Sequence, residues 1–135
     1  EVQQPEAWVF EGTGLRAGEK FGGRFSIVGY ECDGVDWKWE EGEGGRKMVP
    51  TGTDGTPSHF AICATAPASW GPEFDEFPEL AKQAGLAKEG NATMGWYQSE
   101  GGGFVFNAGS TDWVLGLADP AVERITRNVL DAARK

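Results

Sequence analysis

The last segment of the chain, residues 119–135, constrains the fold most strongly. Asp119 is a typical helix N-cap residue, and Pro120 suits the first helical position because its φ angle is already helical. Apolar residues then recur at helical spacing on one face, at Val122, Ile125, Val129 and Ala133. On the exposed face, ion pairs are predicted for Glu123 with Arg127 and for Arg127 with Asp131. The segment therefore predicts a terminal helix that packs one face against a sheet.

Short runs of β-forming residues precede this helix. Three of them predict strands: Ala7–Phe10, Phe25–Tyr30 and Phe60–Ala66. Residues 92–98 and 103–108 flank a Ser-Glu-Gly-Gly turn and predict a hairpin. Residues 36–55 read as a long irregular surface excursion, since they mix acids, glycines and Pro50. Residues 72–85 read as a loop and a short helix, with Pro78 in its first turn and Gly85 at its end.

Strands mixed with flanking helices predict an α/β layer fold with a mixed, mostly parallel sheet. Phe25–Tyr30 is nearly continuous in apolarity, which suits a strand buried on both faces. Only two clear helices accompany about five strands, so loops or another chain would have to cover part of the sheet. The 135 residues suffice for one core, so residues 1–135 are expected to form a single domain.

The formal net charge of −9 argues against two classes of partner. A surface of that sign repels nucleic-acid phosphates and anionic lipid headgroups. No apolar stretch approaches the ~18 residues of a membrane-spanning helix. The 6 Trp, 8 Phe and 2 Tyr supply apolar area for a core and argue against disorder.

Cys32 and Cys63 are too few for a disulfide framework. Both lie at the ends of strand-like runs. Two interpretations remain open, namely two buried free thiols or one disulfide across neighbouring strands.

Polar residues follow three of the predicted strands. They are Glu31-Cys32-Asp33, Thr65, and the Gly109–Trp113 stretch after Asn107. Ligands collect at the carboxyl ends of parallel strands, so Glu31, Thr65, Ser110 and Asp112 are predicted to share one rim. Glu31 directly follows an apolar run, and partial burial would suit its carboxyl group to acid–base work. The alternative is that Glu31 and Asp112 simply accept hydrogen bonds from turn N–H groups.

Other chemistries find little support. His59 is the single histidine, and no nucleophile elbow accompanies it, so a Ser-His-Asp triad is not indicated. One histidine and two cysteines cannot build a standard zinc site. Asn91-Ala92-Thr93 is a glycosylation sequon, which has meaning only in a eukaryotic secreted protein. Five tryptophans could form a sugar-stacking platform or lie in the core: Trp37, Trp39, Trp70, Trp96 and Trp113.

Several sequence blocks together resemble one family. They include FSIVGYECDG (25–34), PTGTDGTP (50–57), FAICATAPASW (60–70), FVFNAGSTDWVLGL (104–117) and DPAVERITRNVLD (119–131). Their order and content resemble the C-terminal part of the N,N-dimethylformamidase large, or beta, subunit family. The ending from Gly101 is also similar to trehalose-utilisation-type relatives of the class I glutamine amidotransferase fold. Both resemblances imply a three-layer α/β arrangement.

The resemblance also implies a chemistry. The family's enzyme hydrolyses a small amide at an iron site, and its iron-binding tyrosines lie upstream of the region that resembles this chain. It therefore implies no metal or other cofactor in this chain, with iron in a partner chain. Glu31 would be the catalytic carboxylate. The predicted binding residues beside it are Asp33, Thr65, Ser110, Asp112 and Trp113.

Three functional hypotheses follow. The first is a C-terminal module or subunit of an amidohydrolase-type protein, not self-sufficient for catalysis, that supplies Glu31 to a site completed by another chain. The second is a non-catalytic interaction subunit, favoured by the acidity and the incompletely covered sheet. The third is a carbohydrate-binding module, motivated by the tryptophans alone.

Overall fold

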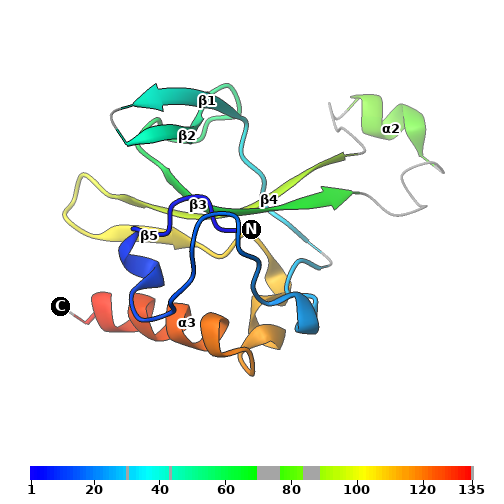
Figure 1. Cartoon of the computed structure of the whole chain (residues 1–135). Helices are drawn as coiled ribbons and strands as arrows, with labels where there is room; N and C mark the ends of the chain where they lie inside the picture. The colour runs from blue at the N-terminus through cyan, green and yellow to red at the C-terminus, as the bar shows by residue number, and fades with distance from the viewer. Residues whose placement is uncertain (30, 43, 70–76, 84–88, 135) are drawn as a thin grey trace.

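The computed structural model describes residues 1–29, 31–42, 44–69, 77–83 and 89–134. Its strands form a two-stranded sheet, β1-β2, and a three-stranded sheet in the order β3-β4-β5 (Figure 1). The strands are β1 Trp37–Gly42, β2 Gly45–Pro50, β3 Ala61–Ser69, β4 Glu89–Gln98 and β5 Phe104–Asn107. The α-helices are α2 Pro78–Gln83 and α3 Pro120–Ala132, and the 3-10 helices are η1 Trp8–Phe10, η2 Gly23–Phe25 and η3 Thr111–Gly116.

All pairings between these strands are antiparallel, so the predicted α/β fold with a mostly parallel sheet is wrong. The chain has a small α+β fold instead. The expected class I glutamine amidotransferase-like arrangement is wrong for the same reason. Short connections join β1 to β2 and β4 to β5, and such connections allow only antiparallel neighbours.

Two of the predicted strands are not strands. Ala7–Phe10 ends in η1, and Phe25–Tyr30 begins at the end of η2 and continues as irregular backbone to residue 29, with Tyr30 outside the described residues. Gly22 and Ser26 have φ angles of 71° and 49°, which turn the chain on both sides of η2. Ile27 is buried, so the apolar run contributes a side chain to the protein interior without pairing as a β-strand. Continuous apolarity does not by itself separate a strand from another buried segment.

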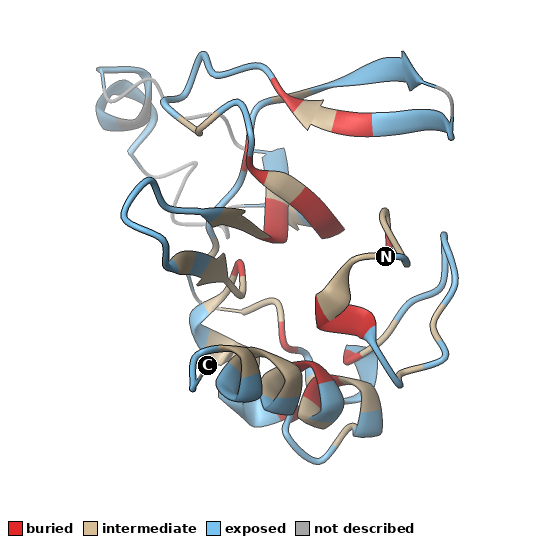
Figure 2. Cartoon of the chain, turned by 90° about the vertical axis from the view of Figure 1, so that its left-hand side faces the viewer, coloured by how far each residue is buried: buried red, intermediate tan, exposed pale blue. Residues whose placement is uncertain are grey.

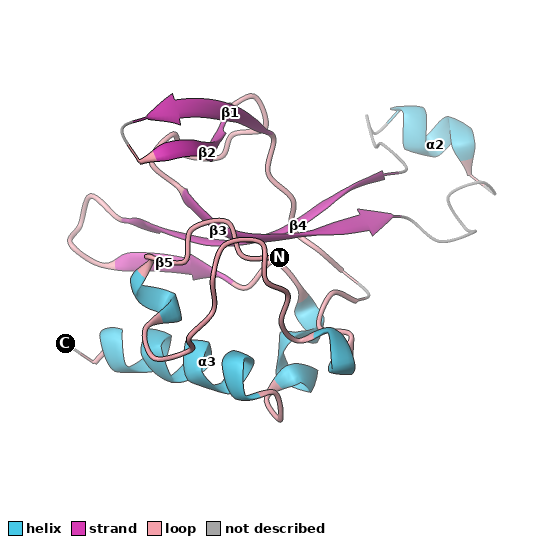
Figure 3. Ribbon diagram, viewed as in Figure 1, coloured by secondary structure: helices cyan, strands magenta, loops and turns pink. Residues whose placement is uncertain are grey.

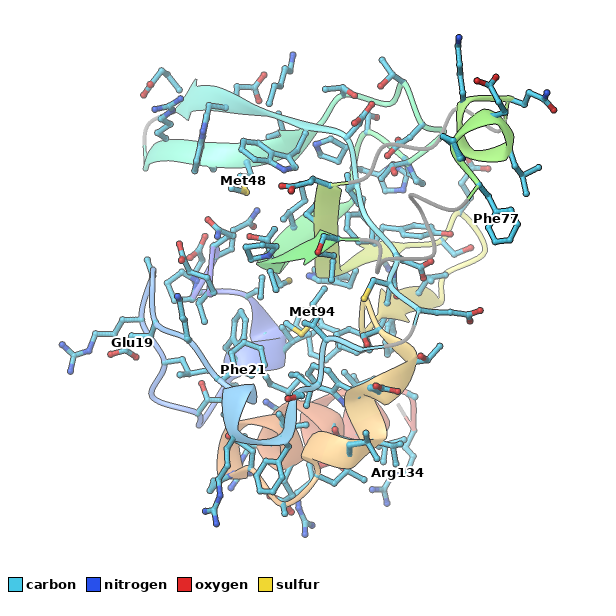
Figure 4. The ribbon with its side chains drawn as sticks, turned by 90° about the vertical axis from the view of Figure 1, so that its right-hand side faces the viewer. Glu19, Phe21, Met48, Phe77, Met94 and Arg134 are labelled. Atoms are coloured by element: carbon cyan, nitrogen blue, oxygen red, sulfur yellow. The ribbon has the colours of Figure 1, made fainter. Side chains whose placement is uncertain are left out.

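The stretch predicted to be irregular, residues 36–55, contains the β1-β2 hairpin. Its register pairs Trp37 with Pro50 and Trp39 with Met48. The hairpin packs over one face of the three-stranded sheet, and Met48 points into the space between them (Figure 4). A small hydrophobic core lies between the hairpin and the sheet, and we call it the second core. Trp37 and Tyr97 pack against its four buried residues, which are Val35, Met48, Phe60 and Ile62. The face expected to lack cover is thus partly covered by the chain itself.

The remaining strand and hairpin predictions are confirmed. β3 contains most of the predicted run 60–66, and β4 and β5 form the predicted hairpin. A register shift between Ile62 and Ala64 marks a β-bulge in β3, and Cys63 and Ala64 both contact the core on the other face of the sheet. α2 begins at Pro78 as predicted, whereas Gly85 lies outside the described residues.

The predicted terminal helix, α3, is confirmed. The Asp119 carboxylate accepts hydrogen bonds from the N–H groups of Ala121 (2.9 Å) and Val122 (3.3 Å), so Asp119 is the N-cap. Val122 and Ile125 are fully buried. The Glu123–Arg127 ion pair is present, whereas Asp131 pairs with Arg134 at 2.6 Å. Ala133 is exposed, because α3 ends at Ala132.

α3 lies beneath the three-stranded sheet, η1 lies between the two, and η3 leads from β5 down to the start of α3 (Figure 3). Buried residues gather where these layers meet (Figure 2). They form the first core: Val2, Val9, Phe10, Cys63, Ala64, Met94 and Ile125. Edge-to-face aromatic contacts extend it, including Phe10 with Phe21 and Phe21 with Trp113. The Asn128 amide joins η1 to α3 by donating to the carbonyls of Val9 (2.9 Å) and Glu11 (2.8 Å).

Both cysteines are free thiols, which is against the predicted disulfide, but only Cys63 is buried, so the interpretation as two buried free thiols is confirmed in part. Cys63 is buried in the first core, and burial together with the nearby Glu6 carboxylate raises the pKa of its thiol to about 12. Cys32 is half-buried, and its Sγ donates to the Gly29 carbonyl at 3.3 Å.

Removing the N-cap should weaken the whole domain. Asp119→Ala is expected to lower the free energy of unfolding by about 1–2 kcal/mol, because it leaves the first N–H groups of α3 unpaired. It also removes an acceptor for the Gly22 N–H at 3.2 Å. Chemical denaturation measures the change. Asp131→Ala is the control at the exposed end of α3 and should shift stability by less than ~0.5 kcal/mol. Equal effects of the two substitutions would contradict the assigned cap.

The two thiols should react very differently with a thiol reagent in the native protein. Thiolate is the reactive form, and burial disfavours it at Cys63. Treatment with an aromatic disulfide reagent at pH 8, followed by peptide mass spectrometry, should label Cys32 and spare Cys63 until denaturant is added. Labelling of Cys63 at the rate of Cys32 would show that the first core is open.

Candidate functional site

The structure brings three of the six predicted site residues together. Glu31, Asp33 and Ser110 line one surface pocket of about 290 Å³. Asn107 and Thr111 complete its lining. We call these five residues the polar hollow. Thr65 and Trp113 instead line a second, mostly apolar pocket of about 60 Å³, and Asp112 lines neither of the two.

The polar hollow is built where two irregular segments pair, not at the carboxyl ends of parallel strands. Cys32 and Ser110 form an isolated antiparallel bridge. The Thr111 N–H donates to the Glu31 carbonyl, and the Asp33 N–H donates to the Gly109 carbonyl, both at 3.1 Å. Glu31 and Ser110, two of the four residues predicted to share one rim, therefore come together through a different topology than the one expected.

Strand β4 anchors both segments. The Thr93 N–H donates to the Asp33 carbonyl at 2.8 Å. Gly109 lies so close to the same residue that a Cβ at position 109 would sit 2.6 Å from the Thr93 carbonyl oxygen. Gly109 also has a φ angle of 77°, and the Asn107 side chain accepts its N–H at 2.9 Å. This turn sets the direction in which Ser110 and Thr111 enter the polar hollow.

The hydroxyl of Ser110 is already an acceptor for two backbone groups. The N–H groups of Gly29 and Asp112 both donate to its Oγ at 3.2 Å. A serine hydroxyl has two acceptor positions and one proton, so Ser110 retains a proton to donate. A base beside it would be needed for nucleophilic work. His59 does not supply one, because it packs edge-on against Tyr97 at 5.4 Å.

Glu31 and Asp33 are exposed, so the predicted partial burial of Glu31 is wrong for the chain by itself. Their main-chain atoms hold the two segments together, which leaves both carboxylates facing solvent. The lining thus combines two carboxylates, one amide and two hydroxyls. Such a surface can accept hydrogen bonds and proton transfers from a ligand or from a covering protein surface.

Asp112, Thr65 and Trp113 have structural contacts. A Cβ on Gly29 would lie 1.6 Å from an Asp112 carboxylate oxygen, so this carboxylate rests against the Gly29 backbone. Thr65 Oγ1 accepts from the Gln3 amide at 3.0 Å. Trp113 packs against the first core, and its indole N–H donates to Thr126 Oγ1 at 3.0 Å. These residues support the fold around the polar hollow and do not line it.

Asn107 and Thr111 were not among the predicted site residues. Both stand in the same turn as Ser110, and an Asn two residues before Gly is a recognisable turn signal. Thr111 was discoverable only through the pairing of its N–H with Glu31, which depends on the tertiary fold.

The structure also places the candidate tryptophans and the glycosylation sequon. Trp37 and Trp39 lie together on β1 with rings 5.4 Å apart, whereas Trp96 and Trp113 pack against the first core, so these four do not form one platform. Trp70 lies outside the described residues. The sequon is engaged in the fold, because the Asn91 side chain bonds to the Val35 backbone in both directions and Thr93 is fully buried.

The described part of the chain lacks a cluster of metal ligands. Within residues 1–29, 31–42, 44–69, 77–83 and 89–134, no three His, Cys, Asp or Glu side chains are grouped as a metal ion requires. Glu31 and Asp33 supply at most two carboxylates at the polar hollow.

Gly109 should be the least replaceable residue of the turn that leads into the polar hollow. Gly109→Ala pays for a left-handed φ angle and also forces a Cβ against the Thr93 carbonyl. Gly102→Ala is the matched control, since Gly102 has a φ angle of 92° but open space around it. Gly109→Ala should lose at least ~1 kcal/mol more unfolding free energy than Gly102→Ala in urea titration. Equal losses would mean that the close approach to β4 is not present in solution.

The chain matches a known family over most of its length. Residues 1–127 match the family described as N,N-dimethylformamidase beta subunit-like, C-terminal. Comparisons with curated proteins and with solved structures give no significant match. None of the helices among the described residues has the length and apolar character needed to cross a membrane. On the strength of the family match, this chain belongs to the N,N-dimethylformamidase beta subunit-like C-terminal family.

Proposed function

We propose that this domain is a C-terminal module or subunit of an amidohydrolase-type, formamidase-like protein. In this proposal it does not catalyse a reaction alone. It supplies Glu31 as an acid–base group to a site that another chain completes, and a small amide is the substrate. Membership of the family supports the class of protein, whereas the polar hollow supports the choice of residue.

The exposure of Glu31 on a firmly held backbone is the observation that carries the proposal. A glutamic acid near neutral pH becomes an effective proton donor when burial disfavours its charged form. In the chain by itself solvent reaches Glu31, so this condition is not met. A second protein surface over the polar hollow would exclude that water. The proposal therefore links catalysis to assembly.

Iron chemistry, which the family resemblance suggests, does not fit the described residues of this chain. Two carboxylates at an exposed hollow fall short of the three or more ligands of a resident ion. We therefore assign any iron to the partner chain and route no catalytic step through it here. Asp33, Asn107, Ser110 and Thr111 are left with the roles of binding and orienting groups beside Glu31.

A non-catalytic interaction subunit is the second candidate function. The exposed apolar residues of η3 favour it, because large apolar side chains in solvent commonly mark contact surfaces. A carbohydrate-binding module receives no comparable support, since the four candidate tryptophans that the structure describes, Trp37, Trp39, Trp96 and Trp113, do not share one surface.

Substitution of Glu31 in the assembled protein separates the candidates. Glu31→Gln keeps the size of the side chain and removes its proton transfer, so the turnover number for amide hydrolysis should fall by about 10²–10⁴. Glu100→Gln, at an exposed position between β4 and β5, is the matched control and should retain full activity. Native mass measurements should show unchanged assembly for both variants.

Two results would count against the proposal. Full amide hydrolysis by the Glu31→Gln assembly would exclude Glu31 as the acid–base group. An intact assembly without any amidase activity, even before substitution, would favour the non-catalytic interaction subunit.

A further inference from the structure

Exposed apolar side chains on η3 and on the residue that follows it begin at the edge of the polar hollow. Val114, Leu115 and Leu117 are 61%, 58% and 41% exposed. We call these three residues the η3 ridge. They lie within seven residues of Thr111, which lines the polar hollow.

The geometry of a 3-10 helix makes this surface continuous. Side chains three residues apart eclipse one another in such a helix, so Thr111 and Val114 lie in one row and Leu117 continues it. All three are exposed, and so is Leu115 on the adjoining row that starts at Asp112. Trp113 and Gly116 form a second row that faces inward, where a Cβ on Gly116 would lie 2.2 Å from Ile27. Because Trp113 and Gly116 pack inward, the side chains of the η3 ridge are held on the solvent side of the helix.

The same connection therefore presents a polar and an apolar part side by side. The apolar part is the η3 ridge. The polar part is the polar hollow, to which the segment bridged at Cys32 adds the exposed carboxylates of Glu31 and Asp33, and Thr111 joins the polar and apolar parts. Arg24 of the adjoining η2 is exposed, and its guanidinium lies over the Phe25 ring, 5.5 Å from the ring centroid. Two carboxylates beside apolar anchors favour a partner surface with cationic side chains.

We infer that the η3 ridge is the docking surface for a separate protein chain that carries an apolar groove bordered by lysine and arginine side chains. This inference rests on the proposed function, because the docked chain would also cover the polar hollow and Glu31. A second copy of this chain fits poorly. Each copy carries a net charge of −9, and a symmetric contact would bring the carboxylates of both copies together.

A matched pair of substitutions on the complex isolated from its source tests the surface. Leu115→Lys places a cation against the cationic border and removes an apolar anchor, so binding of the partner chain should weaken at least about tenfold. Leu130→Lys is the control on α3, since Leu130 is 57% exposed against 58% for Leu115. It should change binding by less than about twofold. Equal thermal unfolding midpoints establish that both variants fold.

A zero-length carbodiimide cross-linker tests the charge argument on the same complex. It should join the carboxylate of Glu31 or Asp33 to a lysine of a different protein chain. Adducts that join two copies of this chain would overturn the inference. Equal binding by the two leucine variants, or isolation of this chain without any other protein, would overturn it as well.

The outcome is separable from that of the proposed function. A complex that survives Leu115→Lys but loses activity with Glu31→Gln refutes the docking surface and leaves the catalytic role standing. A complex that dissociates with Leu115→Lys yet is fully active with Glu31→Gln supports the docking surface and refutes the catalytic role.

Discussion

The attachment of two irregular segments to one residue of β4 is the constraint on which the rest of the structure depends. Thr93 is fully buried, its N–H holds the Asp33 carbonyl, and its own carbonyl lies against Gly109. These contacts bring together segments that are about 75 residues apart along the chain. The polar hollow exists because both segments are fixed at the same point. The side chains around it are free to face solvent because backbone groups make the attachment.

Prediction from the sequence succeeded where local signals decide the structure. The N-cap at Asp119, the helical spacing of α3 and the β4-β5 hairpin are all encoded by neighbouring residues. It failed for Phe25–Tyr30 and for the strand directions, since the role of an apolar run depends on packing partners such as Gly22 and Gly116. Of the four residues predicted to share one rim, Glu31 and Ser110 come together, beside Asp33, through the Cys32–Ser110 bridge and not through a parallel rim. Asp112, Thr65 and Trp113 could not be placed without knowledge of the loops that surround them.

The connection from Asn107 to Leu117 joins the structural and functional arguments. Its first half lines the polar hollow, and its second half carries the η3 ridge. Inward packing of Trp113 and Gly116 between these halves ties the exposed residues to the first core, so this surface is presented on a supported element. An apolar ridge left in solvent is unfavourable in an isolated chain and becomes favourable when a partner buries it. The acid–base role proposed for Glu31 calls for the same covering step, because burial disfavours the charged form of a glutamic acid and so suits it to proton transfer near neutral pH.

The central claim is that this domain acts as part of a larger assembly, and the native mass of the protein isolated from its source, with metal analysis of the same sample, tests it most directly. The account predicts a particle well above the 14.5 kDa of this polypeptide, containing a different polypeptide sequence with which any iron is associated. A metal-free particle of 14.5 kDa that is stable at physiological salt would contradict it.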